Sequence, residues 1–425
     1  MSGNVVRLAV IKRPHGERRL TVTVRGLAMT PGVSERDDGT RDRWIPRAEV
    51  LTLLGVKTQT LYAYVSRGRI TARPDPSDPR RSLYAAADVA RLKGASSGEV
   101  PGVVVPFEPP AVKGEALIQS TVSLISDERL YYRGRDVAQW AQNATLEETA
   151  RLLWAAEDVN PFAGLGVRVD QAGGGSHRAR LFAALARRAE EDPSSTGRAA
   201  EALKAEAAST MNEVVDAVSG PGPRLFFHQR LARGWKMLER DSVHLRRALV
   251  LAADLDMDAA VLATRAAASG GASPAGAAFA GLTTVAGSPT ARTLSQAIAY
   301  VVEARRDPAG AAQRRMEAAG AIPGFGGDLF PHGDPRAEAL LALAELPGDL
   351  TAVIREAEAA SGQRTGFTAA LAIMARRLDL PRDGASDVLL IGRLTGLMAH
   401  ALDQIIDGSP IRARLRYVGP RQAGD

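Results

Sequence analysis

The sequence predicts a mainly α-helical protein in which a small winged helix-turn-helix domain precedes a long helical region. The chain has 425 residues, more than one ordinary core holds, so two or three domains are expected. Hydrophobic residues make up 45% and charged residues 24%, a balance typical of folded proteins. Aromatic residues make up only 5%, whereas alanine and leucine are abundant and lose little entropy on entering a helix.

The composition also excludes several classes of site. The chain has no cysteine, which rules out disulfides, zinc–thiolate sites and thiol nucleophiles. The six histidines show no metal-ligand spacing such as H-x-x-x-H, so neither a metal nor a bound cofactor is expected. Because no apolar run of about 18 residues occurs and residues 1–25 lack a signal-peptide core, we expect a cytoplasmic protein without a membrane span.

Positive charge is concentrated at the N-terminal end. Residues 1–94 hold 18 Lys and Arg against 9 Asp and Glu, whereas the remainder holds 36 basic and 39 acidic residues. The net charge of +6 therefore comes from the first quarter of the chain. Such an asymmetry indicates a segment that binds nucleic acid.

The first domain is predicted over residues 44–94, after a poorly patterned arm of residues 1–43. Pro46 suits the first turn of a helix whose apolar stripe ends at Leu54, and a glycine then permits a tight turn. A second helix is expected over residues 58–66. Two short helices joined by a glycine turn are typical of the helix-turn-helix motif.

The following residues predict a wing. Strands are expected over 69–73 and 80–84, with a turn rich in Pro, Asp and Ser over 74–79, and then a helix over 86–93. The whole unit resembles the MerR/excisionase class, in which the second helix enters the major groove of DNA. The resemblance implies that base edges face Lys57, Gln59, Thr60 and Tyr62, and that phosphates lie near Arg67, Arg69, Arg73, Arg80 and Arg81. The alternative is a small domain that packs on its neighbour and does not touch DNA.

Residues 95–114 are rich in Gly, Ser and Pro and predict a linker. From residue 115 to 425 the chain is predicted to be helical almost throughout, with joints at 173–175, 220–223 and 322–333. No convincing fixed-period repeat is found in this region.

Four stretches of this helical region contain motifs that follow one another along the chain. They are GEALIQSTVSLISDERLYYRGRDVAQWAQNATLEETARLLW, RRALVLAADLDMDAAVLATRAAASGGASPAGAAFAGL, IPGFGGDLFPHGDPRA and IGRLTGLMAHALDQIIDGSPIRARLRYVGP. Together they resemble bacterial citrate synthases. The resemblance implies an all-α fold with a large domain over 115–292 and 389–425, a small closing domain over 293–388, and an obligate dimer. It also implies the family reaction, in which oxaloacetate, acetyl-CoA and water give citrate and CoA, with acetyl-CoA as a substrate.

That reaction needs a base to take a proton from acetyl-CoA, a donor to stabilise the enolate oxygen, and a donor to polarise the ketone of oxaloacetate. The family supplies an aspartate and two histidines, and a further histidine binds oxaloacetate. In this sequence the oxaloacetate-binding, enolate-stabilising, ketone-polarising and base positions are occupied by Leu255, Thr290, Gly327 and Gly366. Because neither glycine has a side chain to move a proton, the sequence predicts that the catalytic set is lost.

The residues expected to bind carboxylates are present. The resemblance assigns Arg336, Arg393 and Arg412 to the carboxylates of oxaloacetate and citrate, with the last reaching across the dimer. Arginine suits this role because its planar guanidinium binds a carboxylate at two points. The alternative is that these arginines form salt bridges between domains. Asp328 lies beside the expected coenzyme A loop, where it would repel phosphates, so acyl-CoA binding is disfavoured.

Two functional hypotheses follow. The first is a non-catalytic homologue that binds a di- or tricarboxylate and acts as a DNA-binding regulator, or as a subunit partnering an intact citrate synthase paralogue, in a homodimer or a heteromer. The second is an active citrate or 2-methylcitrate synthase-type acyltransferase with a non-standard site, in which His332 could supply the missing imidazole.

Overall fold

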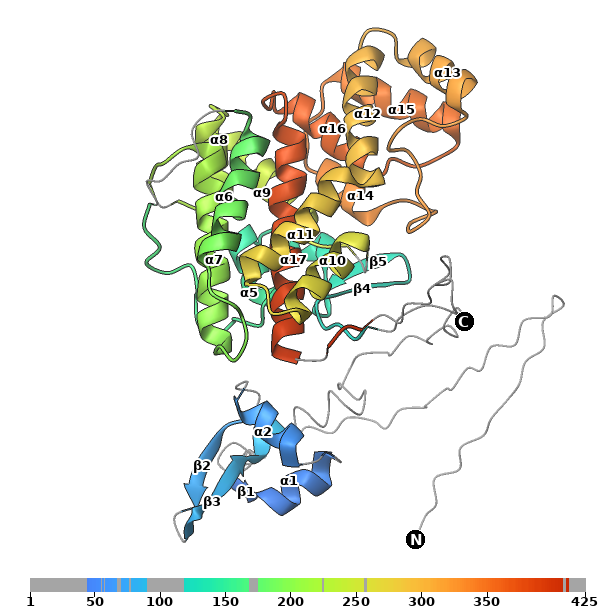
Figure 1. Ribbon diagram of the computed structural model, residues 1–425. Helices are drawn as coiled ribbons and strands as arrows, with labels where there is room; N and C mark the ends of the chain where they lie inside the picture. Colours follow the sequence, from blue (N-terminus) through green and yellow to red (C-terminus); the bar gives the residue numbers. More distant parts are fainter. Residues whose placement is uncertain are drawn as a thin grey trace, which may run out of the picture.

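The structure is a computed structural model that describes residues 44–54, 56, 58–66, 70–75, 78–89, 118–167, 175–223, 225–255, 258–407 and 410–412 (Figure 1). The predicted arm over 1–43 and linker over 95–114 lie outside the described residues, as do Lys57, Arg67 and Arg69. The described residues from 44 to 89 form an N-terminal unit, and those from 118 to 412 form a helical body.

The N-terminal unit combines two short helices with a three-stranded antiparallel sheet. Its elements are β1 (Trp44–Pro46), α1 (Arg47–Leu54), α2 (Thr58–Ser66), β2 (Ala72–Asp75) and β3 (Asp78–Ala85), and the strand order is β1-β3-β2. The unit has its own hydrophobic core, made by Ile45, Val50, Leu61, Ile70, Tyr84 and Val89. The sheet and both helices therefore share one small core.

Three boundaries differ from those predicted. Pro46 ends strand β1 instead of starting a helix, because it pairs with Leu83 across the sheet. The first wing strand begins at Ala72 and includes Pro74 and Asp75, which had been assigned to the turn. The helix expected over 86–93 is described only over 86–89. The second helix has the predicted bounds.

The helical body begins with a small antiparallel sheet, which corrects the prediction that residues 115–425 are helical almost throughout. Its strands are β4 (Ser123–Ser126), β5 (Arg129–Tyr132) and β6 (Arg135–Asp136). Asp127 and Glu128 make the tight turn between the first two strands with φ of 49° and 57°. Positive φ at both turn residues matches the right-handed twist of a hairpin.

The rest of the body is helical, so the predicted mainly helical fold is confirmed for this region. The helices are α4 (Val137–Trp140), α5 (Leu146–Leu153), α6 (His177–Glu191), α7 (Ala200–Ser219), α8 (Phe227–Gly234), the 3₁₀ helix η1 (Glu239–Asp241), α9 (Ser242–Leu251), α10 (Ala259–Ser269), α11 (Pro274–Gly287), α12 (Pro289–Ala304), α13 (Pro308–Ala319), α14 (Pro335–Leu341), α15 (Gly348–Ser361), α16 (Phe367–Arg377) and α17 (Gly384–Asp407).

Local sequence explains where several of these helices begin. Helices α11, α12, α13 and α14 each start with a proline that follows a Ser or Asp N-cap. The cap oxygen accepts a hydrogen bond from a backbone N–H of the first turn, and proline needs no partner for the N–H that it lacks. These starts fix Ser288 and Asp334 at two points of the cavity described below.

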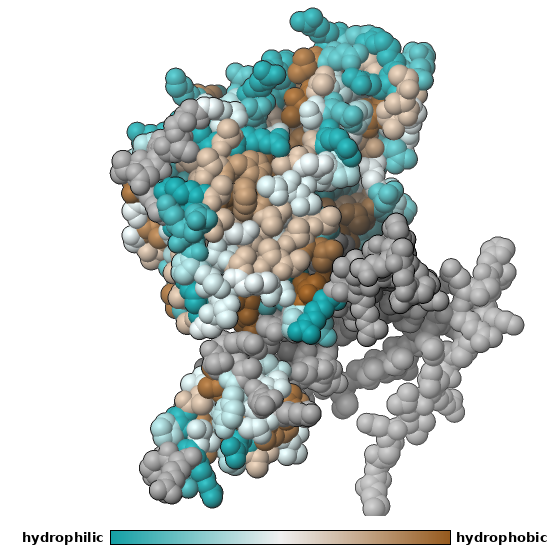
Figure 2. Space-filling model, in the orientation of Figure 1, coloured by the Kyte–Doolittle hydropathy of each residue, from teal (hydrophilic) through white to brown (hydrophobic). Residues whose placement is uncertain are grey.

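Helix α17 runs through the middle of the body, and helices α12 to α16 gather at one end (Figure 1). It is long and apolar enough to cross a membrane, but 83% of its most apolar window is buried inside the protein. That burial is typical of a core helix in a folded domain. Figure 2 shows weakly hydrophobic surface over α10 and α11 and hydrophilic surface around α13.

Candidate functional site

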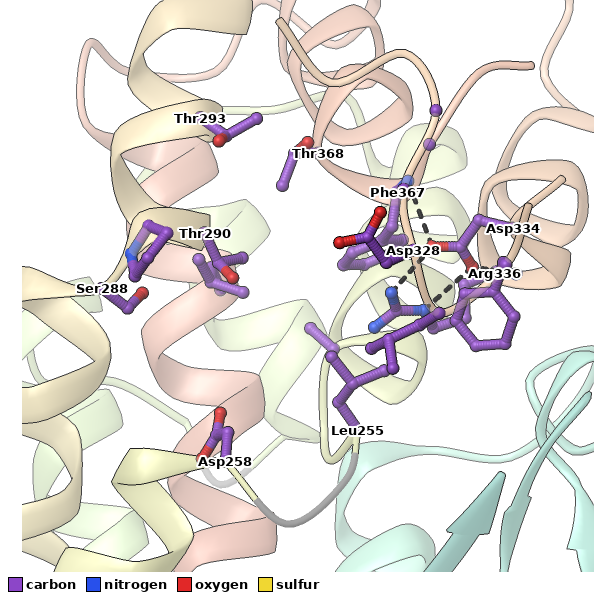
Figure 3. Close-up of a pocket in the computed structure, with 18 of the residues that line it drawn as sticks. Leu255, Asp258, Ser288, Thr290, Thr293, Asp328, Asp334, Arg336, Phe367 and Thr368 are labelled. Atoms are coloured by element: carbon purple, nitrogen blue, oxygen red, sulfur yellow. Dashed lines mark hydrogen bonds and ion pairs between the residues drawn. The ribbon is translucent and has the colours of Figure 1, made fainter. Parts of the chain in front are cut away.

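A cavity of about 440 Å³ lies where α12, α14, α16 and α17 meet the chain that follows α9 (Figure 3). Its walls come from segments far apart in the sequence, which is typical of a binding site. The lining residues are Ala252, Leu255, Asp258, Val285, Ser288, Pro289, Thr290, Thr293, Gly326, Gly327, Asp328, Leu329, Phe330, Asp334, Arg336, Arg364, Gly366, Phe367, Thr368, Leu389 and Arg393.

The structure brings together almost all the residues that the sequence assigned to catalysis and substrate binding. The positions expected to carry the catalytic and oxaloacetate-binding side chains line this one cavity, and so do two of the three arginines: Leu255, Thr290, Gly327, Gly366, Arg336 and Arg393. The exception is Arg412, which is exposed and does not line the cavity within this chain. The N–H of its neighbour Ile411 is bonded to Ser269 Oγ at 2.8 Å.

Two glycine-containing loops contact each other at the cavity wall. Phe325 and Thr365 form an antiparallel β-bridge, and Gly366 N–H donates to Gly324 O at 2.8 Å. Gly326 N–H donates to Arg364 O at 2.7 Å. A Cβ atom added at Gly366 would lie 2.7 Å from Gly324 O, which is closer than a carbon can approach a carbonyl oxygen. The backbone therefore occupies the space that a side chain at position 366 would need.

Gly327 differs from Gly366 because the space around it is open. No atom lies within 4 Å of a Cβ built there, but its φ of +158° is one that residues with side chains rarely adopt. Position 327 therefore offers room to a ligand and no functional group.

Arg336 is already engaged by an aspartate of its own helix. Its Nε and Nη2 donate to Asp334 Oδ1 and Oδ2 at 3.0 and 2.7 Å. Its guanidinium also lies over the rings of Phe367 and Phe330, 4.6 and 5.6 Å from the ring centroids. Asp334 accepts a further hydrogen bond from Phe367 N–H at 3.3 Å. These contacts hold the guanidinium at the edge of the cavity, as Figure 3 shows.

Arg393 is engaged in the same way by two acids. Its Nη1 donates to Asp254 Oδ1 at 2.6 Å and its Nη2 to Asp258 Oδ2 at 3.0 Å. Asp254 is fully buried and also contacts His400 Nε2 at 3.0 Å and the hydroxyl of Ser123 at 2.5 Å. Burial alone would raise the pKa of Asp254, but His400, Arg393 and Ser123 together hold that pKa below its ordinary value.

The remaining polar side-chain groups of the cavity are hydroxyls, the guanidinium of Arg364 and the carboxylate of Asp328. The hydroxyls belong to Ser288, Thr290, Thr293 and Thr368. Asp328 is exposed, makes no hydrogen bond or ion pair to any described residue, and points into the cavity (Figure 3). No histidine is among the described residues that line the cavity. His332 is 85% exposed, and its Nδ1 pairs with Glu128 Oε1 at 2.6 Å.

The acids that pair with the arginines were not identified from the sequence. Asp334 carried a signal, since Asp followed by Pro is typical of a helix start. Asp254 and Asp258 carried none, because their partner Arg393 lies more than 130 residues away along the chain. No group of three or more metal-ligating side chains occurs in the described ranges.

In the N-terminal unit, the structure describes the side chains of four of the residues assigned to DNA. Thr60 and Tyr62 lie on α2, and the ring of Tyr62 is 51% exposed with its hydroxyl 3.1 Å from Arg47 Nη1. The guanidinium of Arg73 lies 4.2 Å from the ring centroid of Trp44. Arg81 pairs with Asp78 at 3.2 Å. Gln59 is part of α2, but its side chain and that of Arg80 lie outside the description.

Comparison with known proteins gives a consistent result for the helical body. The family model described as citrate synthase, C-terminal domain, matches residues 174–414. A search among curated proteins finds no significant match. Among solved structures, citrate synthase from Thermotoga maritima is similar, with a TM-score of 0.57 and 18% identity, covering 72% of this chain and 94% of that one.

Two further solved structures are similar to the same extent. Citrate synthase from Pyrobaculum aerophilum gives a TM-score of 0.57 at 17% identity, covering 72% of this chain and 91% of that one. The citrate synthase of Thermoplasma acidophilum, solved with carboxymethyl coenzyme A and oxaloacetate, gives 0.56 at 16% identity, covering 73% and 95%. At these identities the likeness establishes the fold alone.

Proposed function

This chain belongs to the citrate synthase family, and from that premise we propose that it is a member without citrate synthase activity. The observation that carries the proposal is the composition of one cavity. The three positions assigned to the reacting protons hold Thr290, Gly327 and Gly366, and no imidazole lines the described cavity. A positioned acid or base contributes about 10² to 10⁴ in rate, so the loss of several leaves little turnover.

The closed loop contact supports the same proposal. If Gly366 were only a recent substitution in an otherwise open site, an aspartate could be restored there without moving the backbone. Its Cβ would instead collide with Gly324 O at 2.7 Å. The base position is therefore lost in the backbone as well as in the side chain.

A role as a DNA-binding regulator is the first form of the proposal. Two short helices on a three-stranded antiparallel sheet support a winged helix-turn-helix unit in residues 44–89. The exposed ring of Tyr62 on α2 and the basic surplus of residues 1–94 support contact with nucleic acid. A two-fold dimer would present two such units to two half-sites.

A role as a partner subunit is the second form. The resemblance places Arg412 across a dimer, and in this chain it is exposed near the end of α17 and free of the chain's own cavity. The weakly hydrophobic surface over α10 and α11 in Figure 2 supports association with a second copy or with an intact citrate synthase paralogue. In such a pair Arg412 would complete the partner's site.

One observation favours a second candidate, an active acyltransferase with a different base. Asp328 directs into the cavity a carboxylate that has no ionic partner among the described residues, beside the position where the resemblance implies a histidine. His332, the substitute suggested by the sequence, points to Glu128 and does not line the cavity. Asp328 is therefore the residue on which this candidate depends.

A coupled assay with oxaloacetate and acetyl-CoA tests the proposal. We expect neither the wild-type protein nor Asp328→Asn, which keeps the shape of the side chain and removes the base, to release CoA above the rate measured without protein. Turnover at a rate ordinary for an enzyme, about 1 s⁻¹ or faster, that is lost in Asp328→Asn would refute the proposal and establish the active candidate. DNA binding is tested by the shift of promoter fragments, which should weaken steeply as salt rises.

A further inference from the structure

The charges around the cavity show which ligand it suits. Each guanidinium that lines it is already paired with a carboxylate of this chain. Arg336 pairs with Asp334 at 2.7 Å, Arg393 with Asp254 at 2.6 Å, and Arg364 with Glu358 at 3.0 Å. A guanidinium neutralised by its own carboxylate attracts an incoming anion less than a free one does.

Asp328 adds a negative charge that nothing in the described part of the chain compensates. Asp258 and Asp334, the other lining aspartates, are each held by an arginine and by a helix cap. Asp328 has neither, and its carboxylate faces the cavity in Figure 3 between Thr290 and Arg336. A di- or tricarboxylate placed there would meet a like charge that no ion pair with a described residue neutralises.

We infer that this cavity binds a small ligand in which an ammonium group stands beside a carboxylate, as in an α-amino acid. The ammonium group pairs with Asp328. The carboxylate accepts from Arg336 Nη1, the nitrogen of that guanidinium that makes no hydrogen bond within the described residues, because Nε and Nη2 are used by Asp334. The inference rests on the proposed loss of catalysis, since a protein that must bind oxaloacetate for turnover could not favour such a ligand.

The other walls of the cavity fit the same ligand. Leu255 lines the cavity at the position where the resemblance implies a histidine that binds oxaloacetate, so that substrate would lack one polar contact here. Thr290, Thr293 and Thr368 can donate or accept, and therefore tolerate either an amine or a hydroxyl. Phe330 and Phe367 hold the Arg336 guanidinium in place, so little order must be imposed when the carboxylate binds.

The test compares two ligands that differ at one carbon. L-Aspartate and oxaloacetate share a four-carbon dicarboxylate skeleton, with an ammonium group in one and a keto oxygen in the other. We expect calorimetry at pH 7.5 to show that aspartate binds about ten-fold or more tightly than oxaloacetate, the scale of one hydrogen bond between charged groups. Succinate, which has neither group, should bind no better than oxaloacetate.

Variants assign the preference to a residue. Asp328→Asn should abolish the advantage of aspartate over oxaloacetate, and Asp379→Asn, at an aspartate that is 92% exposed elsewhere on the surface, should leave it unchanged. Equal or tighter binding of oxaloacetate by the wild type, no binding of aspartate at millimolar concentration, or an unchanged preference in Asp328→Asn would each overturn the inference. These outcomes concern ligand binding, whereas the proposed function is tested by CoA release, so the two can fail independently.

Discussion

The buried core around Asp254 and the two loops around Gly324 and Gly366 at the cavity wall are built from different kinds of contact. In the core, Asp254 is buried and satisfied by the side chains of Arg393, His400 and Ser123. At the cavity wall, the two loops meet through backbone hydrogen bonds around Gly324 and Gly366. The core contacts stabilise the fold whether or not a reaction occurs, whereas side chains at the loop positions would serve chemistry alone. The proposed loss of the catalytic side chains would therefore leave the core of the scaffold intact.

The largest effect is expected when the core contact is broken. Asp254→Ala leaves His400 Nε2 and Arg393 Nη1 buried without the carboxylate that they contact, so that Arg393 keeps only the partly exposed Asp258, and the free energy of unfolding should fall by about 3–5 kcal/mol. Urea denaturation at pH 7 followed by circular dichroism measures it. Asp258→Ala is the matched control, because its side chain is 45% exposed and pairs with the same arginine. That control should lose about 1 kcal/mol, mainly through the helix cap of α10. Equal losses would contradict the difference between a buried and an exposed partner.

Glu147 differs from Asp254 because no side chain among the described residues donates a hydrogen bond to its carboxylate. Glu147 Oε1 accepts from Phe227 N–H at 2.6 Å, but its Oε2 is buried with no hydrogen-bond partner in the described chain. Burial raises the pKa of Glu147 to about 7. The folded state therefore binds a proton on Glu147 more tightly than the unfolded state does. Protonation of Glu147 contributes fully to the free energy of unfolding below pH 4.5, and this contribution is lost as the pH rises through about 7.

Glu147→Gln should therefore stabilise the protein at pH 8 by up to about 3 kcal/mol and change little at pH 5. The amide oxygen still accepts from Phe227 N–H, so the variant removes the charge and keeps that contact. Thermal unfolding at the two pH values measures the difference. Glu317→Gln, on the surface of α13, serves as the control and should show no such pH dependence. A gain in stability that is the same at both pH values would count against a raised pKa.

The sequence predicted more of the secondary structure than of the contacts between side chains. The bounds of the helix over 58–66, the joints near Gly220 and Gly327, and the clustering of the family's site positions followed from local patterns and the resemblance. The β4–β5 hairpin was missed although its turn at Asp127 and Glu128 separates two apolar runs.

Long-range pairs could not be predicted at all. Arg393 lies 139 residues from Asp254, and periodicity does not show which acid a given arginine meets. The resemblance assigned these arginines to substrate carboxylates and left salt bridges as the alternative, but it could not show which acids they meet. Loop contacts such as that between Gly324 and Gly366 share this limit, because glycine in a sequence does not reveal which backbone approaches it.

An intermediate effect is expected at the loop contact itself. Gly366→Ala places a methyl group 2.7 Å from Gly324 O, so the β-bridge must open and the free energy of unfolding should fall by about 2 kcal/mol. The φ of Gly366 is −90°, which alanine adopts without strain, so the cost is one of space alone. Chemical denaturation measures the loss, and hydrogen exchange at Gly326 N–H and Gly366 N–H reports whether the bridge has opened. Wild-type exchange with full stability would show that the loops are not held together as described.

The smallest effect is expected at Gly327 in the facing loop, where backbone conformation and not lack of space opposes a side chain. Gly327 has an open surrounding but a φ of +158°, so Gly327→Ala meets no atom and costs only the backbone strain, about 1 kcal/mol. The Gly327→Ala variant should show hydrogen exchange across the Phe325–Thr365 bridge at the wild-type rate, because no contact of the bridge changes. If Gly327→Ala opened the bridge as much as Gly366→Ala, the two loops would respond as one strained unit, and their closed arrangement would depend on backbone conformation more than on the close approach of Gly324 O to position 366.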